Sequence, residues 1–141
     1  MNIALKIVKA SLEYYGSYSN FSKSGGKVVG KKEFSNSIKI YLKNSGLENQ
    51  VSFSFSKNRI SGTSVVHNVG GTTELIIREP IKYRKNRVLD ILNHEIGTHC
   101  IRKFNEHVQM WSKKRSKYKL KDFMHIEEGL GCIHTLYERA R

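Results

Sequence analysis

The chain has 141 residues, the length of one domain or of part of one. Hydrophobic residues make up 38% of it and proline occurs once, which excludes a disordered tail or a low-complexity linker. Lysine and arginine (25) outnumber aspartate and glutamate (12), and the formal net charge is +13. This charge predicts an acidic partner, which could be nucleic acid, an anionic membrane surface or an acidic protein tail.

The residue patterns favour a cytoplasmic protein without a membrane span. Lysines interrupt the apolar runs, so none is long enough to cross a bilayer. The N-terminal segment does not read as a signal peptide, because Leu5, Val8 and Leu12 follow a helical stripe and no small-residue cleavage site comes after them. Cys100 and Cys132 provide no disulfide framework, and reduced thiols are typical of the cytoplasm.

The N-terminal third is predicted to be helical with one polar interruption. Residues 1–16 have a helical apolar stripe that ends near Gly16. Residues 17–30 are rich in Ser, Gly and Lys, so we expect a flexible loop there. Residues 31–45 are again helical in period and are followed by Gly46, which suits the position after a helix. The apolar face of this second helix consists of Phe34, Ile38, Tyr41 and Leu42.

The period then changes from helical to alternating, which is typical of strands. Alternating Val or Phe and Ser at 51–55 predict a half-buried strand. Residues 63–67 and 74–78 predict a hairpin pair across the turn at Gly70–Gly71. Pro80 ends this block, because proline cannot continue a strand ladder.

Helices are predicted again in the C-terminal half. The first covers residues 86–104, a basic segment with one tryptophan follows at 107–121, and the last begins near Asp122. The apolar side of the first consists of Val88, Leu89, Ile91 and Leu92. Both ends of the chain lie inside helical patterns. We therefore expect an α+β fold in which residues 1–141 form a single domain that is either part of a larger one or a strongly shortened version of it.

The helix at 86–104 carries the main chemical signal. Its motif His94-Glu95-Ile96-Gly97-Thr98-His99 brings together two imidazoles and a carboxylate, as zinc peptidase sites require. The familiar spacing is H-E-x-x-H, because residues i and i+4 share a helix face. Here the second histidine is at i+5, about 140° away on a regular α-helix. We therefore predict a π-type turn at Ile96–Thr98, because i→i+5 hydrogen bonds would bring both histidines onto one face.

The third zinc ligand is expected from a following helix. Glu127-Glu128-Gly129-Leu130 opens the last predicted helix and is the best downstream source of a carboxylate. We favour Glu128 as the ligand, because Gly129 beside it would let the helix approach the metal closely. Glu127 is expected to support the site or to be solvated. Glu95 would take a proton from the attacking water and pass it to the leaving amine.

Other interpretations of the same residue types remain open. Cys100, Cys132 and His134 could join His99 in a structural zinc site. They contain no C-x-x-C pair, so we favour buried thiols for the cysteines. His67 lies in a predicted strand and is expected to be a core or surface histidine rather than a ligand.

In the segments His94–His99 and Glu127–Leu130, which form the two ligand blocks, the sequence resembles the microtubule-associated tyrosine carboxypeptidases and their bacterial relatives named for a Q-E-G-L-A motif. H-E-I-G-T-H is followed by Arg102 and Asn105, which is similar to the family's H-E-I-G-T-H-x-x-R-x-x-N. Residues 61–68 and 76–78 also resemble the family's hairpin. The resemblance covers residues 30–141 and is most specific around the two ligand blocks.

The resemblance implies a gluzincin-like metallopeptidase catalytic domain, in which a small antiparallel sheet or hairpin packs with a pair of zinc-site helices. It implies one Zn²⁺ per chain, held by His94, His99 and Glu128, with Glu95 as the catalytic residue. Eukaryotic members remove a C-terminal tyrosine from α-tubulin, so an acidic protein tail, tubulin or microtubules would be the partner and the location cytoskeletal. A bidentate arginine suits the substrate's terminal carboxylate, and we favour Arg102.

The chain departs from the family's T-E-E-G-L-A motif at two positions. Ile126 replaces the threonine, and loss of such an N-cap typically costs about 1 kcal/mol. Gly131 replaces the alanine, which weakens a helix by about 1 kcal/mol. Neither change removes a predicted ligand.

Two other functions fit parts of the sequence. A catalytically inactive module could hold microtubules through its charge. The basic run at 113–121, with Trp111 and Tyr118, could grip the substrate tail or a polymer surface, although such runs are more often simply solvated. A nucleic-acid binder is motivated only by the net charge, and no helix-turn-helix, RNA-recognition or zinc-finger pattern supports it. No membrane partner is expected. We therefore rank the zinc carboxypeptidase first.

Overall fold

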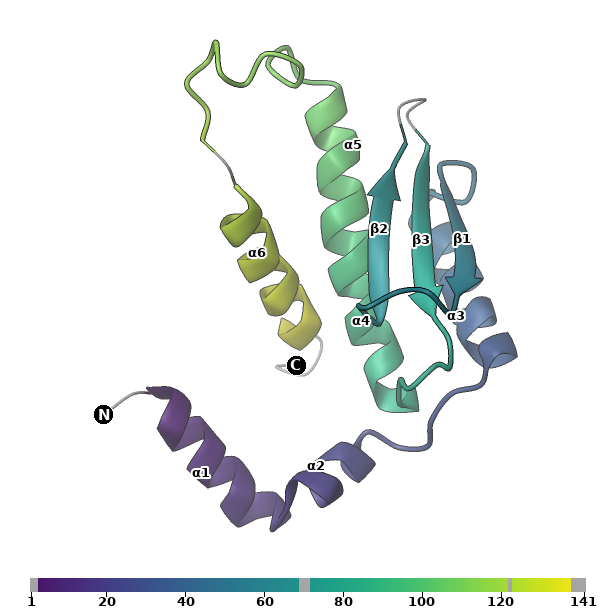
Figure 1. The fold of residues 1–141 in the computed structure, drawn as a ribbon, viewed down its shortest axis with the longest axis vertical. Coiled ribbons are helices and arrows are strands. Elements are labelled where there is room, and N and C mark those ends of the chain that lie inside the picture. Colours follow the sequence, from purple (N-terminus) through teal and green to yellow (C-terminus); the bar gives the residue numbers. More distant parts are fainter. Residues whose placement is uncertain (1–2, 69–71, 122, 138–141) are drawn as a thin grey trace.

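The N-terminal part of the computed structural model is helical (Figure 1). The structure describes residues 3–68, 72–121 and 123–137. Helix α1 covers Ile3–Tyr15, α2 covers Tyr18–Ser24 and α3 covers Lys31–Asn44. The predicted helices at both ends of this region are therefore confirmed.

Helix α2 corrects the expectation of a loop over residues 17–30. Its first turn is capped by Ser17, whose hydroxyl accepts a hydrogen bond from the Asn20 N–H at 3.2 Å. The Phe21 ring also packs edge-on against Tyr15 of α1. A short polar helix that is held by its cap and by individual side-chain contacts has no hydrophobic period for a sequence pattern to show.

The three strands form one mixed sheet in the order β1-β3-β2. Strand β1 covers Val51–Ser56, β2 covers Thr63–His67 and β3 covers Thr73–Arg78. Strands β2 and β3 form the predicted antiparallel pair, whereas β1 runs parallel to β3. The expected turn at Gly70–Gly71 lies outside the described residues. The expectation of an antiparallel sheet is therefore wrong for β1, because alternation marks a strand but not the direction of its partner.

A continuous helical rod follows the sheet. A 3₁₀ turn at Lys85–Arg87 leads into α4 (Val88–His94), a π-helical segment η2 (Glu95–Cys100) and α5 (Ile101–His107). The predicted long helix is therefore confirmed. Of its predicted apolar side, Val88 and Leu92 are buried, whereas Leu89 is exposed.

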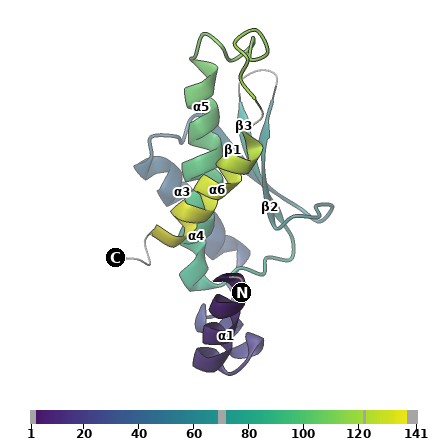
Figure 2. The same ribbon diagram turned by 90° about the vertical axis from the view of Figure 1, so that its left-hand side faces the viewer.

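Helix α6 (Met124–Tyr137) runs back along the rod and packs against α4 and η2. Figure 2 shows α3, α4 and α5 on one side of the sheet. The core between these layers is formed by fully buried Phe34, Ile38, Leu75, Ile77, Ile96 and Cys100. Because Ile96 and Cys100 belong to η2, the core fixes the segment that carries the chemical motif. Within the described residues, every helix is too short or too polar to span a bilayer.

Candidate metal centre

The helix changes to π geometry at the histidine motif. The Ile101 N–H donates to the Ile96 carbonyl, an i→i+5 bond, and the Thr98 hydroxyl donates to the Asn93 carbonyl at 3.2 Å. The extra residue in this turn brings His94 and His99 together, with ring centroids 5.0 Å apart. The π-type turn predicted at Ile96–Thr98 is confirmed, and it extends over all of η2.

Gly97 has a further role in this turn, since it makes room for α3. A Cβ at Gly97 would lie 2.7 Å from the Tyr41 hydroxyl oxygen. That hydroxyl donates at 2.8 Å to Oδ1 of Asn93, the residue directly before the motif. The glycine therefore lets α3 support the π turn directly.

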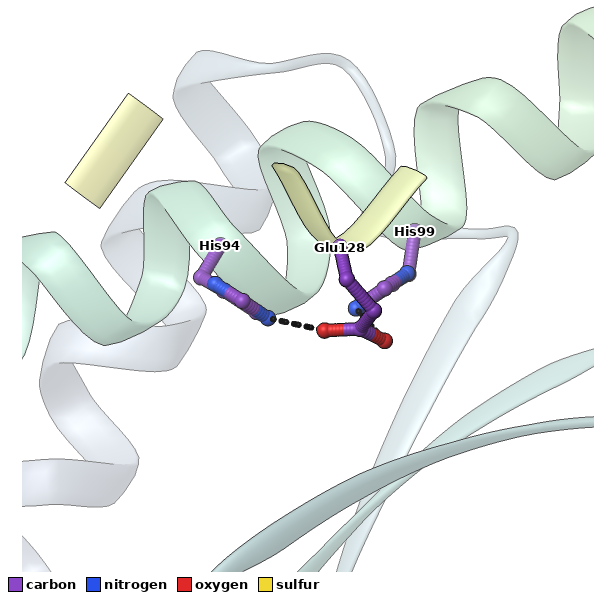
Figure 3. Close-up of side chains that lie close together, drawn as sticks. All are labelled: His94, His99 and Glu128. Carbon is purple, nitrogen blue, oxygen red and sulfur yellow. Dashed lines mark ion pairs between the residues drawn. The ribbon is translucent and has the colours of Figure 1, made fainter. Parts of the chain in front are cut away.

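Two helices bring three potential ligands together, as Figure 3 shows. The Glu128 carboxylate lies between the histidines, with one oxygen 3.5 Å from His94 Nε2 and the other 3.5 Å from His99 Nε2. One ligand atom from each residue lies within 4.8 Å of the others. Ligands bound tetrahedrally to zinc at about 2.0–2.2 Å are roughly 3.4 Å apart. The two 3.5 Å contacts are close to this spacing, so these three side chains could hold a metal ion.

The hydrogen bonds behind the two rings leave Nε2 of each ring free to bind a metal. Nδ1 of His99 lies 2.6 Å from Glu127 Oε1, so this nitrogen donates to the carboxylate. Nδ1 of His94 lies 3.4 Å from the Thr135 hydroxyl, which itself donates to the Gly131 carbonyl at 2.8 Å. An imidazole whose Nδ1 carries the proton presents a lone pair at Nε2. The contacts of the two Nδ1 atoms are compatible with the tautomer whose Nε2 faces a metal.

Glu127 supports the site, which was one of its two predicted roles. Its side chain is only 11% exposed, whereas that of Glu128 is 52% exposed. Besides His99 it contacts Nε of Arg102, and the Arg102 guanidinium lies over the Phe123 ring at 3.4 Å. Arg102 therefore lies behind His99. A substrate carboxylate would have to compete with Glu127 for this guanidinium, and the predicted role of Arg102 in substrate binding stays a prediction.

The prediction that Gly129 lets the last helix approach the histidines closely is wrong, although Glu128 does lie beside them. A Cβ on Gly129 would meet no atom within 4 Å, so Gly129 permits no close approach. The glycine that does so is Gly131, where a Cβ would lie 2.7 Å from Cε1 of His94. The departure from the family motif at this position therefore accommodates the His94 ring.

Glu95 lies beside the histidines in a cavity of about 380 Å³. The cavity is lined by strand β2 on one side and by η2 and α6 on the other, and its lining includes Thr63, Val65, Met124 and Glu128. Burial raises the pKa of Glu95 above its ordinary value, as does the nearby carboxylate of Glu128, while the two histidines oppose this shift. A carboxylate with a raised pKa is a better proton acceptor than an ordinary one.

The other candidate ligands do not form a second metal group within the described residues. Cys100 is buried in the core, and burial raises its pKa to about 12, whereas Cys132 is exposed. Nδ1 of His134 lies 2.8 Å from the Thr98 hydroxyl. His67 is a surface residue at the edge of the Glu95 cavity, with Nδ1 3.0 Å from Thr73 Oγ1.

Three residues near the centre were not identified from the sequence. Thr135 and Gly131 could have been found, because positions 127, 131 and 135 share one helix face. Tyr83 could not, since no motif marks it. Its hydroxyl bonds to that of Thr63, and burial raises its pKa, with the negative charge of Glu95 acting in the same direction.

The resemblance inferred from the motifs is confirmed by comparison with known proteins. No family model matches the chain. Microtubule-associated tyrosine carboxypeptidase 1 of Rattus norvegicus is 30% identical over 145 aligned residues, covering 100% of this chain and 30% of that protein. The Mus musculus and Homo sapiens proteins of the same name are each 29% identical, over 100% and 98% of this chain. The chain spans 30% of the length of these relatives.

Proposed function

We propose that this chain is the metal-binding catalytic core of a zinc-dependent carboxypeptidase that removes a C-terminal tyrosine from an acidic protein tail such as that of α-tubulin. The observation that carries this proposal is the convergence of His94, His99 and Glu128 beside Glu95. The similarity to relatives named as tyrosine carboxypeptidases supports the reaction.

His94, His99 and Glu128 would hold the zinc ion. Zinc supplies a Lewis acid that polarises a peptide carbonyl and acidifies water. Glu127 and Thr135 lie against Nδ1 of the two rings, and these contacts favour the tautomer in which Nε2 is available for binding. The core residues beneath η2 keep the two rings at their separation, which limits the reorganisation that metal binding requires.

Glu95 acts as the proton carrier of the reaction. Its carboxylate takes a proton from the attacking water, whose oxygen forms the new bond to the scissile carbonyl carbon. The same proton then passes to the leaving nitrogen as the C–N bond breaks. The raised pKa of Glu95 suits both halves of this transfer, because the group must accept the proton and release it again.

The charge of the chain suits an acidic partner. A net charge of +13 attracts an acidic tail at long range and would increase the rate of encounter with it. The word microtubule in the names of the relatives makes tubulin the first substrate to test and the cytoskeleton the expected location.

The test is a Glu95→Gln variant, with Glu48→Gln on the exposed surface as the matched control. Release of free tyrosine from a peptide ending in Glu-Glu-Tyr is followed by chromatography, and bound zinc by mass spectrometry. Glu95→Gln should retain one zinc per chain and lose the release of tyrosine, whereas Glu48→Gln should keep both. Wild-type release by Glu95→Gln would refute the assigned role. One zinc per chain without turnover of any peptide by the wild type would instead favour a non-enzymatic binding module.

A further inference from the structure

A second cavity, larger than the first, lies beside the metal centre. It measures about 550 Å³ and lies between the facing ends of strands β2 and β3 and the last turns of the long helix. Its lining includes Lys103, Phe104, His107 and Lys113, together with the amide side chains of Asn49, Gln50 and Asn68. None of the described residues that line it is acidic.

The two lysines of this cavity are available to a ligand. Among the described residues, Lys113 has no carboxylate partner. Lys103 is 47% exposed and lies 3.4 Å from Glu106. Glu106 is already bound more closely by Arg115, at 2.8 Å, so Lys103 can turn toward a ligand at little cost to that cluster. Ammonium groups beside amide N–H donors are suited to carboxylates.

The two cavities are neighbours along strand β2. His67 lines both of them, and its ring is held by the hydrogen bond to Thr73. A peptide lying over His67 would therefore reach from Glu95 to the lysines. Lys103 comes eight residues after Glu95 along the helical rod, a length of about 12 Å at 1.5 Å per residue. An extended chain advances about 3.3 Å per residue, so it needs three to four residues to cover this length.

We infer that the larger cavity binds the acidic side chains that precede the scissile bond of the peptide substrate, an inference that rests on the proposed function. A carboxypeptidase that removes one residue has a single substrate residue on the C-terminal side of the scissile bond. A path that takes several residues must therefore bind the substrate residues on the N-terminal side of that bond. The positive lining matches the acidic residues in that part. Lys103 and Lys113 are the groups that select them.

The test compares two double variants of equal charge in the full chain. Lys103→Gln/Lys113→Gln removes the cavity lysines, and Lys39→Gln/Lys43→Gln removes two exposed lysines from α3, which line a separate cavity between α3 and β1. The substrates are a peptide ending in Glu-Glu-Glu-Tyr and its counterpart ending in Gln-Gln-Gln-Tyr. Partly exposed charge pairs contribute modestly, so the cavity variant should raise KM for the acidic peptide about tenfold and leave kcat unchanged. KM for the glutamine peptide, and both constants of the α3 variant, should stay within about twofold of the wild type.

A charge-reversal variant tests for a change of substrate preference, which a general loss of affinity would not produce. Lys113→Glu should prefer a peptide ending in Lys-Lys-Glu-Tyr to the acidic one, because the sign of the favoured side chain follows the sign at position 113. Equal KM changes in the cavity and α3 variants, or an unchanged preference in Lys113→Glu, would overturn the inference while leaving the proposed function intact. If no peptide is cleaved, the inference is tested by binding of a fluorescein-labelled Glu-Glu-Glu-Tyr peptide to the same variants. Weaker binding by the cavity variant alone supports the inference. Equal binding by the cavity and α3 variants refutes it.

Discussion

The imidazole of His94 lies directly against the backbone of Gly131. A Cβ at position 131 would be 2.7 Å from Cε1 and 2.8 Å from Nδ1 of the ring. One turn later, Thr135 lies 3.4 Å from the same Nδ1. Helix α6 therefore supplies both the carboxylate of Glu128 and the surface against which one of the two histidines rests.

Gly131→Ala should weaken zinc binding by about tenfold, because the ring has to move away from Glu128 and Thr135. The matched control is Gly129→Ala, two residues earlier on the same helix, where a Cβ meets no atom within 4 Å. Both substitutions add about 1 kcal/mol of helix preference, so Gly129→Ala should be stabilising, whereas in Gly131→Ala the displacement of the His94 ring offsets this gain. Zinc affinity measured by competition with a chelating dye distinguishes them. Equal affinities in the two variants would show that Gly131 does not set the position of His94.

Glu127→Ala should lower zinc affinity by about ten- to a hundredfold without removing a ligand, because His99 loses the group that holds its Nδ1 proton. Glu127→Gln keeps an oxygen that can accept from Nδ1 and should lose less. The same chelator competition measures both variants. An affinity for Glu127→Ala equal to that of the wild type would contradict the orienting role.

Gly97→Ala should destabilise the chain by pushing Tyr41 away from the π turn. Overpacking typically costs about 1–3 kcal/mol, and the helix preference of alanine offsets about 1 kcal/mol of this. In a Tyr41→Phe background, which lacks the hydroxyl oxygen 2.7 Å from the new Cβ, the same change should be neutral or stabilising. Urea denaturation of the four proteins gives the coupling energy. Additive effects would mean that Gly97 and Tyr41 do not interact.

Glu106→Gln should lower stability most at neutral pH. Burial alone raises the pKa of Glu106, but the hydrogen bond from Arg115 and the charges of Lys103 and Arg102 outweigh it, so the pKa lies below its ordinary value. The ionised carboxylate therefore stabilises the fold fully above the ordinary glutamate pKa of about 4.3, which applies to the unfolded chain. This stabilisation is lost as the pH falls through the lowered pKa of the folded state. We expect a loss of about 2 kcal/mol at pH 7.

The measurement for Glu106 is the free energy of unfolding of wild type and Glu106→Gln between pH 7 and pH 3. The difference between the two proteins should narrow below pH 4, because the wild-type carboxyl then takes up a proton. A difference that is constant over this range would show that the ionised form of Glu106 does not support the fold.

The arrangement of the residues in the candidate metal centre was largely predictable because its constraints are local. Two histidines at i and i+5 cannot share a face on a regular α-helix, so the spacing itself predicted the π geometry observed from Glu95 to Cys100. The long helix and α3 were predictable for a similar reason, since a helical hydrophobic period reports the face that packs on the core.

What the sequence did not predict depends on contacts between distant residues. The parallel pairing of β1 with β3 leaves no mark on the alternating pattern of either strand. The choice between Gly129 and Gly131 as the close-contact glycine depends on which side of α6 faces His94. Arg115, expected to belong to a solvated or substrate-gripping run, instead binds Glu106 and lies over Phe123, because the chain after α5 folds back on itself.

The position of the metal ion is tested most directly by anomalous X-ray scattering at the zinc edge from crystals grown with zinc. We predict a single strong peak per chain, about 2.0–2.2 Å from Nε2 of His94, from Nε2 of His99 and from a carboxylate oxygen of Glu128. The peak should vanish in crystals of His99→Ala. A peak elsewhere in the chain, or zinc-containing crystals without a peak between these three side chains, would contradict the account.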